Sequence, residues 1–189
     1  LAEVGALNCL AKHRRDALWQ VERELREGDL FVDQGEFIES DATEQEVMPL
    51  LPMNAVERLQ ADYRGLELTT GPHPMALVRS QLSGIWRASD LPQARDGETV
   101  QIAGNVICRQ RPGTAKGVVF ITLEDETGMS NAIVSPPLFE KLRLVITQEA
   151  FLIIRGKVQN RENVILIRAE NVERLPHEDL VGSESYDFH

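Results

Sequence analysis

The 189-residue sequence has few aromatic residues, two cysteines and a deficit of positive charge. Phe, Trp and Tyr make up 5% of it, which excludes a long track of aromatic side chains for stacking bases. Cys9 and Cys108 have neither zinc-site nor disulfide-framework spacing, which suits a reducing cytoplasm. Because no apolar run approaches the roughly 18 residues of a membrane span, we expect no membrane partner.

Sequence signatures of catalysis are also missing. We find no P-loop, no GxSxG, no HExxH and no Cys/His zinc spacing. We therefore expect no catalytic residue, no metal ligand and no cofactor in this segment. The sequence opens with Leu and no secretory signal, and we interpret it as part of a longer polypeptide.

The shortage of positive charge is uneven along the chain. Overall there are 20 Lys and Arg against 30 Asp and Glu, a net charge of −10, which is unusual for a protein that binds nucleic acid. Residues 99–175, however, hold 10 basic and 8 acidic residues, whereas both flanks are acidic. A mildly basic segment of this kind predicts weak, auxiliary contact with nucleic acid.

That mildly basic segment has the pattern of a small barrel. Five β-rich runs surround one helical stretch, in the order β-β-β-α-β-β of a five-stranded Greek-key barrel of the oligonucleotide-binding (OB) type. Such barrels bind single strands on strands 2 and 3 and on the loops joining strands 1–2 and 4–5. The expected strands are Thr99–Arg111, Gly117–Glu124, Met129–Val134, Ala150–Val158 and Val164–Arg174.

Helices are expected ahead of the barrel, which makes the fold class α+β. Apolar residues at helical spacing predict a helix over Lys12–Glu27. A second helix should follow Asn54, because Glu57 completes a capping box, and a third should begin at Pro74. We predict five regions: the helix-bearing residues 1–27, an acidic linker at 28–52, a helical connector at 53–96, the barrel at 97–175 and a disordered acidic tail at 176–189.

The loop after the first strand holds the best candidates for nucleic-acid contact. Arg109, Arg111 and Lys116 are its three cations, no acid lies among them, and glycines allow a phosphate chain to approach closely. If strand 2 alternates with Val119 inward, then Phe120 faces outward as a base-stacking platform. A solvated hairpin loop and a buried Phe120 are the alternatives.

Other polar residues are weaker candidates. Asn131 on strand 3 is expected to contact a base edge, and Arg161 in the strand 4–5 turn to hold phosphate. The acids 124–126 match a solvated turn without a partner cation, and His73 matches a helix cap. The basic cluster at 12–15 has two interpretations, a phosphate contact or a charged helix surface.

Several strings together resemble a known family, the bacterial C-family DNA polymerases. The closest match is the error-prone, damage-inducible paralogue of the replicative polymerase III alpha subunit, over its C-terminal part. The strings are His13–Trp19, Glu57–Tyr63, Gly71–Met75, and Arg109–Gly117 continuing through Phe120–Gly128.

The resemblance implies a DNA-directed DNA polymerase, a nucleotidyltransferase, acting in translesion synthesis and damage-induced mutagenesis. It implies that residues 1–27 end a tandem helix-hairpin-helix region and that the barrel lies near single-stranded template. Catalytic carboxylates and Mg²⁺ would lie upstream. The implied partners are single-stranded and primer-template DNA, a Y-family-like accessory protein and the sliding clamp, although no clamp-binding motif is found here.

Three alternatives stay open. The replicative alpha subunit resembles the chain less in the strings at 71–75 and 109–117. The run Phe120–Asp125 also resembles the anticodon-binding barrel of class II aminoacyl-tRNA synthetases, in which the barrel precedes the catalytic domain. A protein-interaction module, docking a basic partner through its acidic flanks, is the third.

Overall fold

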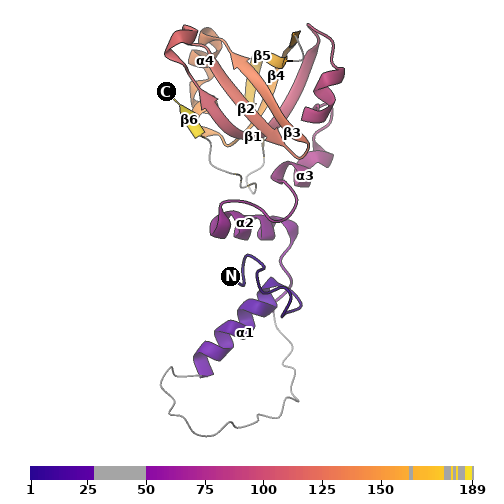
Figure 1. Cartoon of the computed structure of the whole chain (residues 1–189), viewed down its shortest axis with the longest axis vertical. Coiled ribbons are helices and arrows are strands. Elements are labelled where there is room, and N and C mark those ends of the chain that lie inside the picture. Colours follow the sequence, from indigo (N-terminus) through magenta and orange to yellow (C-terminus); the bar gives the residue numbers. More distant parts are fainter. Residues whose placement is uncertain (28–49, 162–163, 177–179, 181, 183–185, 189) are drawn as a thin grey trace. The chain divides into compact units, whose positions relative to one another are not determined.

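The computed structural model describes residues 1–27, 50–161, 164–176, 180, 182 and 186–188 (Figure 1). The greater part of the predicted acidic linker, residues 28–49, lies outside this set, as do Glu162 and Asn163 of the strand 4–5 turn. The chain divides into two compact units, Leu1–Leu66 and Glu67–His189. Within the described residues, none of the helices combines the length and the apolar character needed to cross a membrane.

The first unit contains two helices, α1 (Arg14–Glu27) and α2 (Ala55–Leu66). The capping box predicted for α2 is confirmed, because the Glu57 amide donates to Asn54 Oδ1 at 2.9 Å and the Asn54 amide donates to Glu57 Oε2 at 2.8 Å. These two hydrogen bonds satisfy amides that have no partner inside the helix.

Two arginines of the basic cluster at residues 12–15 make contacts inside this unit. Arg14 is buried and donates to Asp62 Oδ1 at 2.6 Å and to the Glu3 carbonyl oxygen at 3.2 Å. Arg15 donates to Glu57 Oε1 at 2.9 Å. For Arg14, the predicted choice between a phosphate contact and a charged helix surface was therefore wrong, because its guanidinium ties α1 to α2.

The second unit begins with short helical turns: α3 (Pro74–Val78), η1 (Arg79–Gln81) and η2 (Ala88–Gln93). The prediction that His73 caps a helix is confirmed, since its Nδ1 accepts from the Met75 amide at 3.1 Å. Burial lowers the pKa of His73, although Glu124 and neighbouring acids act to raise it. A neutral imidazole is the form that is able to accept this hydrogen bond.

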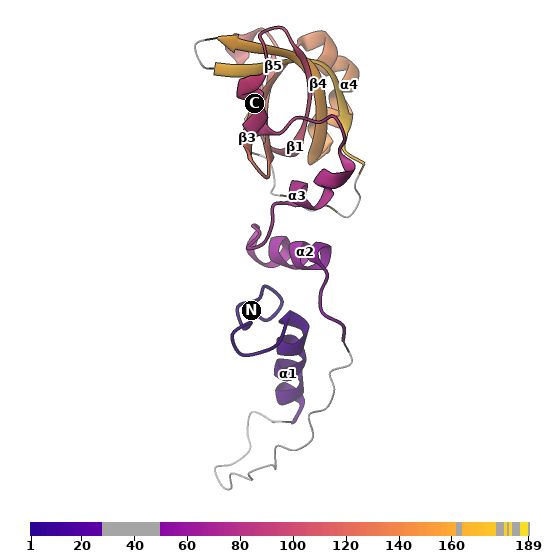
Figure 2. The same cartoon turned by 90° about the vertical axis from the view of Figure 1, so that its right-hand side faces the viewer.

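Five strands then close into the predicted barrel. They are β1 (Thr99–Gln110), β2 (Val119–Asp125), β3 (Gly128–Val134), β4 (Phe151–Arg161) and β5 (Val164–Arg174). Pairing runs β1–β2–β3–β5–β4 and returns to β1, with β3 and β5 parallel and the other pairs antiparallel. Figures 1 and 2 show the strands curving around one axis, with the helix α4 (Pro136–Gln148) beside them.

The barrel core consists of inward-facing aliphatic side chains from all five strands. Ile102, Ile121, Val134, Ile154 and Ile167 are at most 1% exposed. Phe139 and Ile146 of α4 pack into the same core, so the helix is held by its apolar face. At residue 104 of β1 only glycine fits, because a Cβ there would lie 2.5 Å from the Glu124 carbonyl oxygen.

The predicted disordered tail differs from the structure at its end. Tyr186–Phe188 form a short strand, β6, parallel to β1 at Cys108–Gln110. The physical reason is that β4 pairs with β1 only as far as Asn105, so the following main-chain groups of β1 need another partner on that side. Residues 177–179, 181, 183–185 and 189 of the tail lie outside the described part of the chain.

Candidate nucleic-acid interface

The outer face of β2 and β3 carries a mixed aromatic and polar surface. Along β2, Val119, Ile121 and Leu123 are at most 3% exposed, whereas Phe120 and Thr122 between them are half-buried. The predicted alternation is therefore confirmed, and the Phe120 ring faces away from the core. An aromatic ring in this position offers a flat apolar surface to a base.

Asn131 lies on the same face, opposite Thr122. The Thr122 hydroxyl donates to Asn131 Oδ1 at 2.8 Å, which fixes the exposed amide side chain. Because its oxygen accepts from Thr122, the amide has its two N–H donors left to offer to a further partner. Phe120 pairs with Ile133 two residues along the register, which is the next pair on this face, so an apolar pair and a polar pair are neighbours there.

The loop between β1 and β2 keeps two of its three predicted cations accessible. Arg111 is 45% exposed at its side chain, and its guanidinium carbon lies 4.8 Å from the centroid of the Phe139 ring. Lys116 is exposed and adopts a left-handed backbone conformation at φ 50°, at the end of the 3-10 turn Gly113–Ala115. Both side chains are positioned to meet an anion from solvent.

Arg109, the third predicted loop cation, faces inward. It belongs to β1, and its guanidinium donates to the carbonyl oxygens of Ile146 and Glu149, each at 2.6 Å. These carbonyls end α4, where a positive charge is favourable because helix C-termini carry partial negative charge. With a side chain only 10% exposed, Arg109 holds α4 to β1, and we remove it from the proposed contact residues.

Arg161 is exposed at the last position of β4, opposite Val164. The two residues that follow it lie outside the described residues, so the position of Arg161 is known only as the last residue of the strand. The prediction that Arg161 holds phosphate stays a prediction.

Three further cations on the barrel surface were missed by the sequence interpretation. Arg155 and Lys157 are exposed on β4, and Arg168 is exposed on β5. In the register, Phe120 pairs with Ile133, Ile133 with Arg168, and Arg168 with Lys157. We call these four residues the cross-strand row. At about 4.8 Å between strands, it spans roughly 14 Å.

A sequence signal for these cations existed in the alternation of β4. Buried Gly156 and Val158 alternate with exposed Arg155 and Lys157. A side chain at Gly156 would collide with the Arg168 carbonyl oxygen, so glycine lets β5 approach closely here. The outward positions follow from that alternation, but only the pairing of β3 with β5 shows that they continue the row from Phe120.

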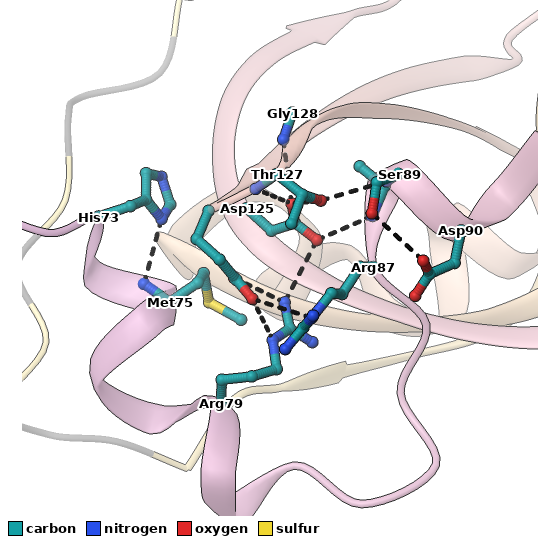
Figure 3. Close-up of polar contacts among 11 residues, drawn as sticks. His73, Met75, Arg79, Arg87, Ser89, Asp90, Asp125, Thr127 and Gly128 are labelled. Carbon is teal, nitrogen blue, oxygen red and sulfur yellow. Dashed lines mark hydrogen bonds and ion pairs between the residues drawn. The ribbon is translucent and has the colours of Figure 1, made fainter.

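The acidic turn after β2 is not the solvated turn that was predicted. Asp125 is 6% exposed, and Arg79 donates to Glu126 Oε1 at 2.6 Å and Oε2 at 2.8 Å and to Asp125 Oδ2 at 3.2 Å (Figure 3). Arg87 adds a longer contact to Glu126, at 3.4 Å. The main partner cation, Arg79, lies 46 residues before Asp125 and 47 before Glu126, beyond the reach of a local sequence pattern.

The electrostatics of this turn stabilise its charges. The hydrogen bond to Glu126 raises the pKa of Arg79 despite burial. Burial acts to raise the pKa of Glu126, but the Arg79 side-chain hydrogen bond, a backbone hydrogen bond and the Arg79 charge together outweigh it, and the pKa is lowered. Asp125 also accepts from the Thr127 and Ala88 amides, at 2.7 and 2.9 Å. The acids therefore act as structural anchors for the segment before the barrel.

Comparison with known proteins agrees with this geometry. The OB-fold nucleic acid binding domain family matches residues 90–175. The chain is 40% identical over its whole length to an error-prone DNA polymerase of Anaeromyxobacter sp. (strain K), and 42% identical over 93% of its length to one of Pseudomonas syringae pv. tomato. The chain is similar to a segment of bacterial error-prone DNA polymerases. This confirms the resemblance predicted from its motifs.

The chain spans 16% of the length of these relatives. Among solved structures, asparaginyl-tRNA synthetase from Pyrococcus horikoshii matches at a TM-score of 0.42 and 24% identity, over 50% of this chain and 23% of that one. OB folds serve many ligands, so this likeness does not distinguish one nucleic acid from another.

Proposed function

We propose that the chain is the C-terminal DNA-binding region of an error-prone DNA polymerase that acts in translesion synthesis and damage-induced mutagenesis. The parent protein is a DNA-directed nucleotidyltransferase, and its barrel contacts the single-stranded template. The observation that carries this proposal is the outward cross-strand row, with an aromatic ring at one end and two exposed cations at the other.

The proposed contact divides its work between stacking and charge. Phe120 supplies the stacking surface, and Asn131 presents amide donors to a base edge. Arg111 and Lys116 lie on the β1–β2 loop, and Lys157 and Arg168 form the far end of the cross-strand row. Together with Arg161 at the end of β4, these cations attract the phosphate chain. One aromatic ring and a few cations give weak binding, as expected for an auxiliary template contact.

The chemistry of nucleotide transfer belongs to the rest of the parent polymerase. Among the described residues, no group of three or more His, Cys, Asp or Glu side chains is arranged to hold a metal ion. We assign the Mg²⁺ ions of the polymerase reaction, the sliding clamp and the accessory protein to the parent protein. The working compartment that fits this role is the cytoplasm.

Titration of labelled nucleic acids tests this function. The 189-residue chain is mixed with a single-stranded DNA oligonucleotide, its duplex and a tRNA at two salt concentrations. We expect weak, salt-sensitive binding that favours single-stranded DNA. A preference for tRNA would support an anticodon-binding barrel instead, and no binding to any of the three would support a protein-interaction module.

A double variant tests the cross-strand row itself. The double variant Lys157→Gln, Arg168→Gln should make the negative slope of log association constant against log salt shallower by about 1.4. Each phosphate contact with a single strand contributes about 0.7 to that slope. Arg95→Gln, an exposed cation before the barrel, is the control and should have little effect. An unchanged slope in the double variant would remove this row from the interface.

A further inference from the structure

A cavity of about 150 Å³ lies beside the proposed contact face, between the end of β1, α4 and β6. Its floor is apolar and includes Phe139 and Ile146. Three arginines line it: Arg109 and Arg111 from the β1 end, and Arg143 from α4. Three guanidinium groups around one small cavity concentrate positive charge there. Because like charges repel, an anion bound between them would lower the electrostatic energy.

The three arginines differ in how many of their N–H groups already make hydrogen bonds. Arg109 donates to the main-chain carbonyls at the end of α4, as described above. Arg111 lies 3.7 Å from Glu140 Oε1, which is too long for a good hydrogen bond, and its side chain is 45% exposed. Arg143 is exposed and makes no ion pair with any residue in the described part of the chain. Arg111 and Arg143 therefore have donors available.

The chain itself places an anionic oxygen in this cavity. Asp187 of β6 lines the cavity, and its Oδ1 lies 3.4 Å from Arg109 Nη1. The position follows from strand pairing, because Asp187 lies opposite Arg109 in the parallel register of β6 and β1. At 38% exposure, and with one long contact among the described residues, this carboxylate is loosely held.

We propose that this cavity binds a phosphate group of single-stranded DNA, held by Arg111 and Arg143, in the position that the Asp187 carboxylate otherwise approaches. The proposal rests on the proposed function. A guanidinium fork matches phosphate geometry, and the apolar floor strengthens the attraction by excluding water from one side. The Arg111 guanidinium carbon lies 4.8 Å from the centroid of the Phe139 ring, and this cation–π contact holds the side chain at the cavity.

The first test uses a cation pair on one helix. Arg143→Gln in the 189-residue chain should weaken binding of a single-stranded DNA oligonucleotide roughly fivefold and lower the salt slope by about 0.7. Lys141→Gln is the matched control, because Lys141 is an exposed α4 cation that does not line the cavity. Equal affinities and slopes for the two variants would overturn the proposal.

The second test concerns the carboxylate. Asp187→Asn should tighten binding about two- to threefold by freeing the cavity, and this gain should disappear in an Arg143→Gln background because the two residues act on one site. A gain of the same size in both backgrounds would overturn the competition between Asp187 and phosphate.

Paired oligonucleotides identify the source of the phosphate. The same strand is titrated with a 5′-phosphate and with a 5′-hydroxyl. If Arg143→Gln weakens both equally, the cavity holds an internal phosphodiester; if it abolishes an advantage of the 5′-phosphate, the cavity holds the terminal monoester. If the unsubstituted chain did not bind single-stranded DNA at all, the proposed function itself would be contradicted. Failure of the cavity proposal and failure of the proposed function are therefore distinguishable.

Discussion

The two ends of β2 use charged residues in opposite ways. At its C-terminal end, Asp125 and Glu126 are held by Arg79 in a largely buried set of hydrogen bonds. At its N-terminal end, Arg111 and Lys116 are exposed on a turn with no acid among residues 109–117. One end therefore fastens the barrel to the segment before it, and the other presents charge to solvent.

The difference shows that charge alone does not mark a binding residue. Arg79 and Arg109 have the same side chain as Arg111, yet both are about nine-tenths buried and donate to groups of their own chain. Arginines of this kind add to the fold rather than to the interface. Measurements of stability and of DNA binding on the same variants separate the two roles.

The largest effect is expected at Arg79. Arg79→Ala leaves the Glu126 and Asp125 carboxylates without their cation, and removing one partner of a buried pair costs about 3–5 kcal/mol of unfolding free energy. Urea unfolding measures it. Arg87→Ala is the control, since Arg87 is 51% exposed and its contact with Glu126 is longer, so its loss should cost less than about 1 kcal/mol. Equal losses would contradict the anchoring role.

Arg109→Ala should be the next largest. It removes two charge-assisted hydrogen bonds to the end of α4 and should cost about 2 kcal/mol of stability. Lys116→Ala, at the exposed end of the same loop, should change stability by less than about 0.5 kcal/mol and should weaken DNA binding instead. If Lys116 proved the more important for folding, the assignment of roles would be reversed.

Phe120→Ala should affect binding more than folding. Loss of a base-stacking ring costs about 1–3 kcal/mol, or roughly a thirtyfold loss of affinity for single-stranded DNA in the middle of that range. Leu144→Ala is the control, because Leu144 is 69% exposed on α4 and does not belong to the cross-strand row. An unchanged affinity for Phe120→Ala, measured by fluorescence anisotropy, would remove stacking from the proposal.

The smallest effect is a pH dependence at the anchored end. The pKa of Glu126 is lowered from its ordinary value of 4.5, so the folded protein releases this proton more readily than the unfolded chain. Its stabilising contribution is then complete above about pH 4.5 and is lost as pH falls through the lowered value. The stability gap between the unsubstituted chain and Glu126→Gln should narrow below pH 4.5; a constant gap would contradict this.

Local sequence chemistry was sufficient to predict the elements of the barrel and the helices before it. The Asn54–Glu57 capping box, the His73 cap and the alternation of Val119, Phe120 and Ile121 each depend on residues a few positions apart. Hydrophobic periodicity and turn residues therefore located every strand of the barrel, and β5 has the predicted bounds. The same local pattern placed Phe120 on the outside.

Contacts between distant residues decided the rest. By itself, the sequence determined the five barrel strands, the main helices, the outward face of β2 and the likeness to error-prone DNA polymerases. Only the tertiary structure decided that Arg109 donates to the carbonyls at the end of α4 and that Arg79 pairs with the acidic turn. It also decided that Arg168 and Lys157 continue the row from Phe120. The physical reason is that the partner of a long polar side chain is set by strand register and barrel closure, which bring together residues tens of positions apart.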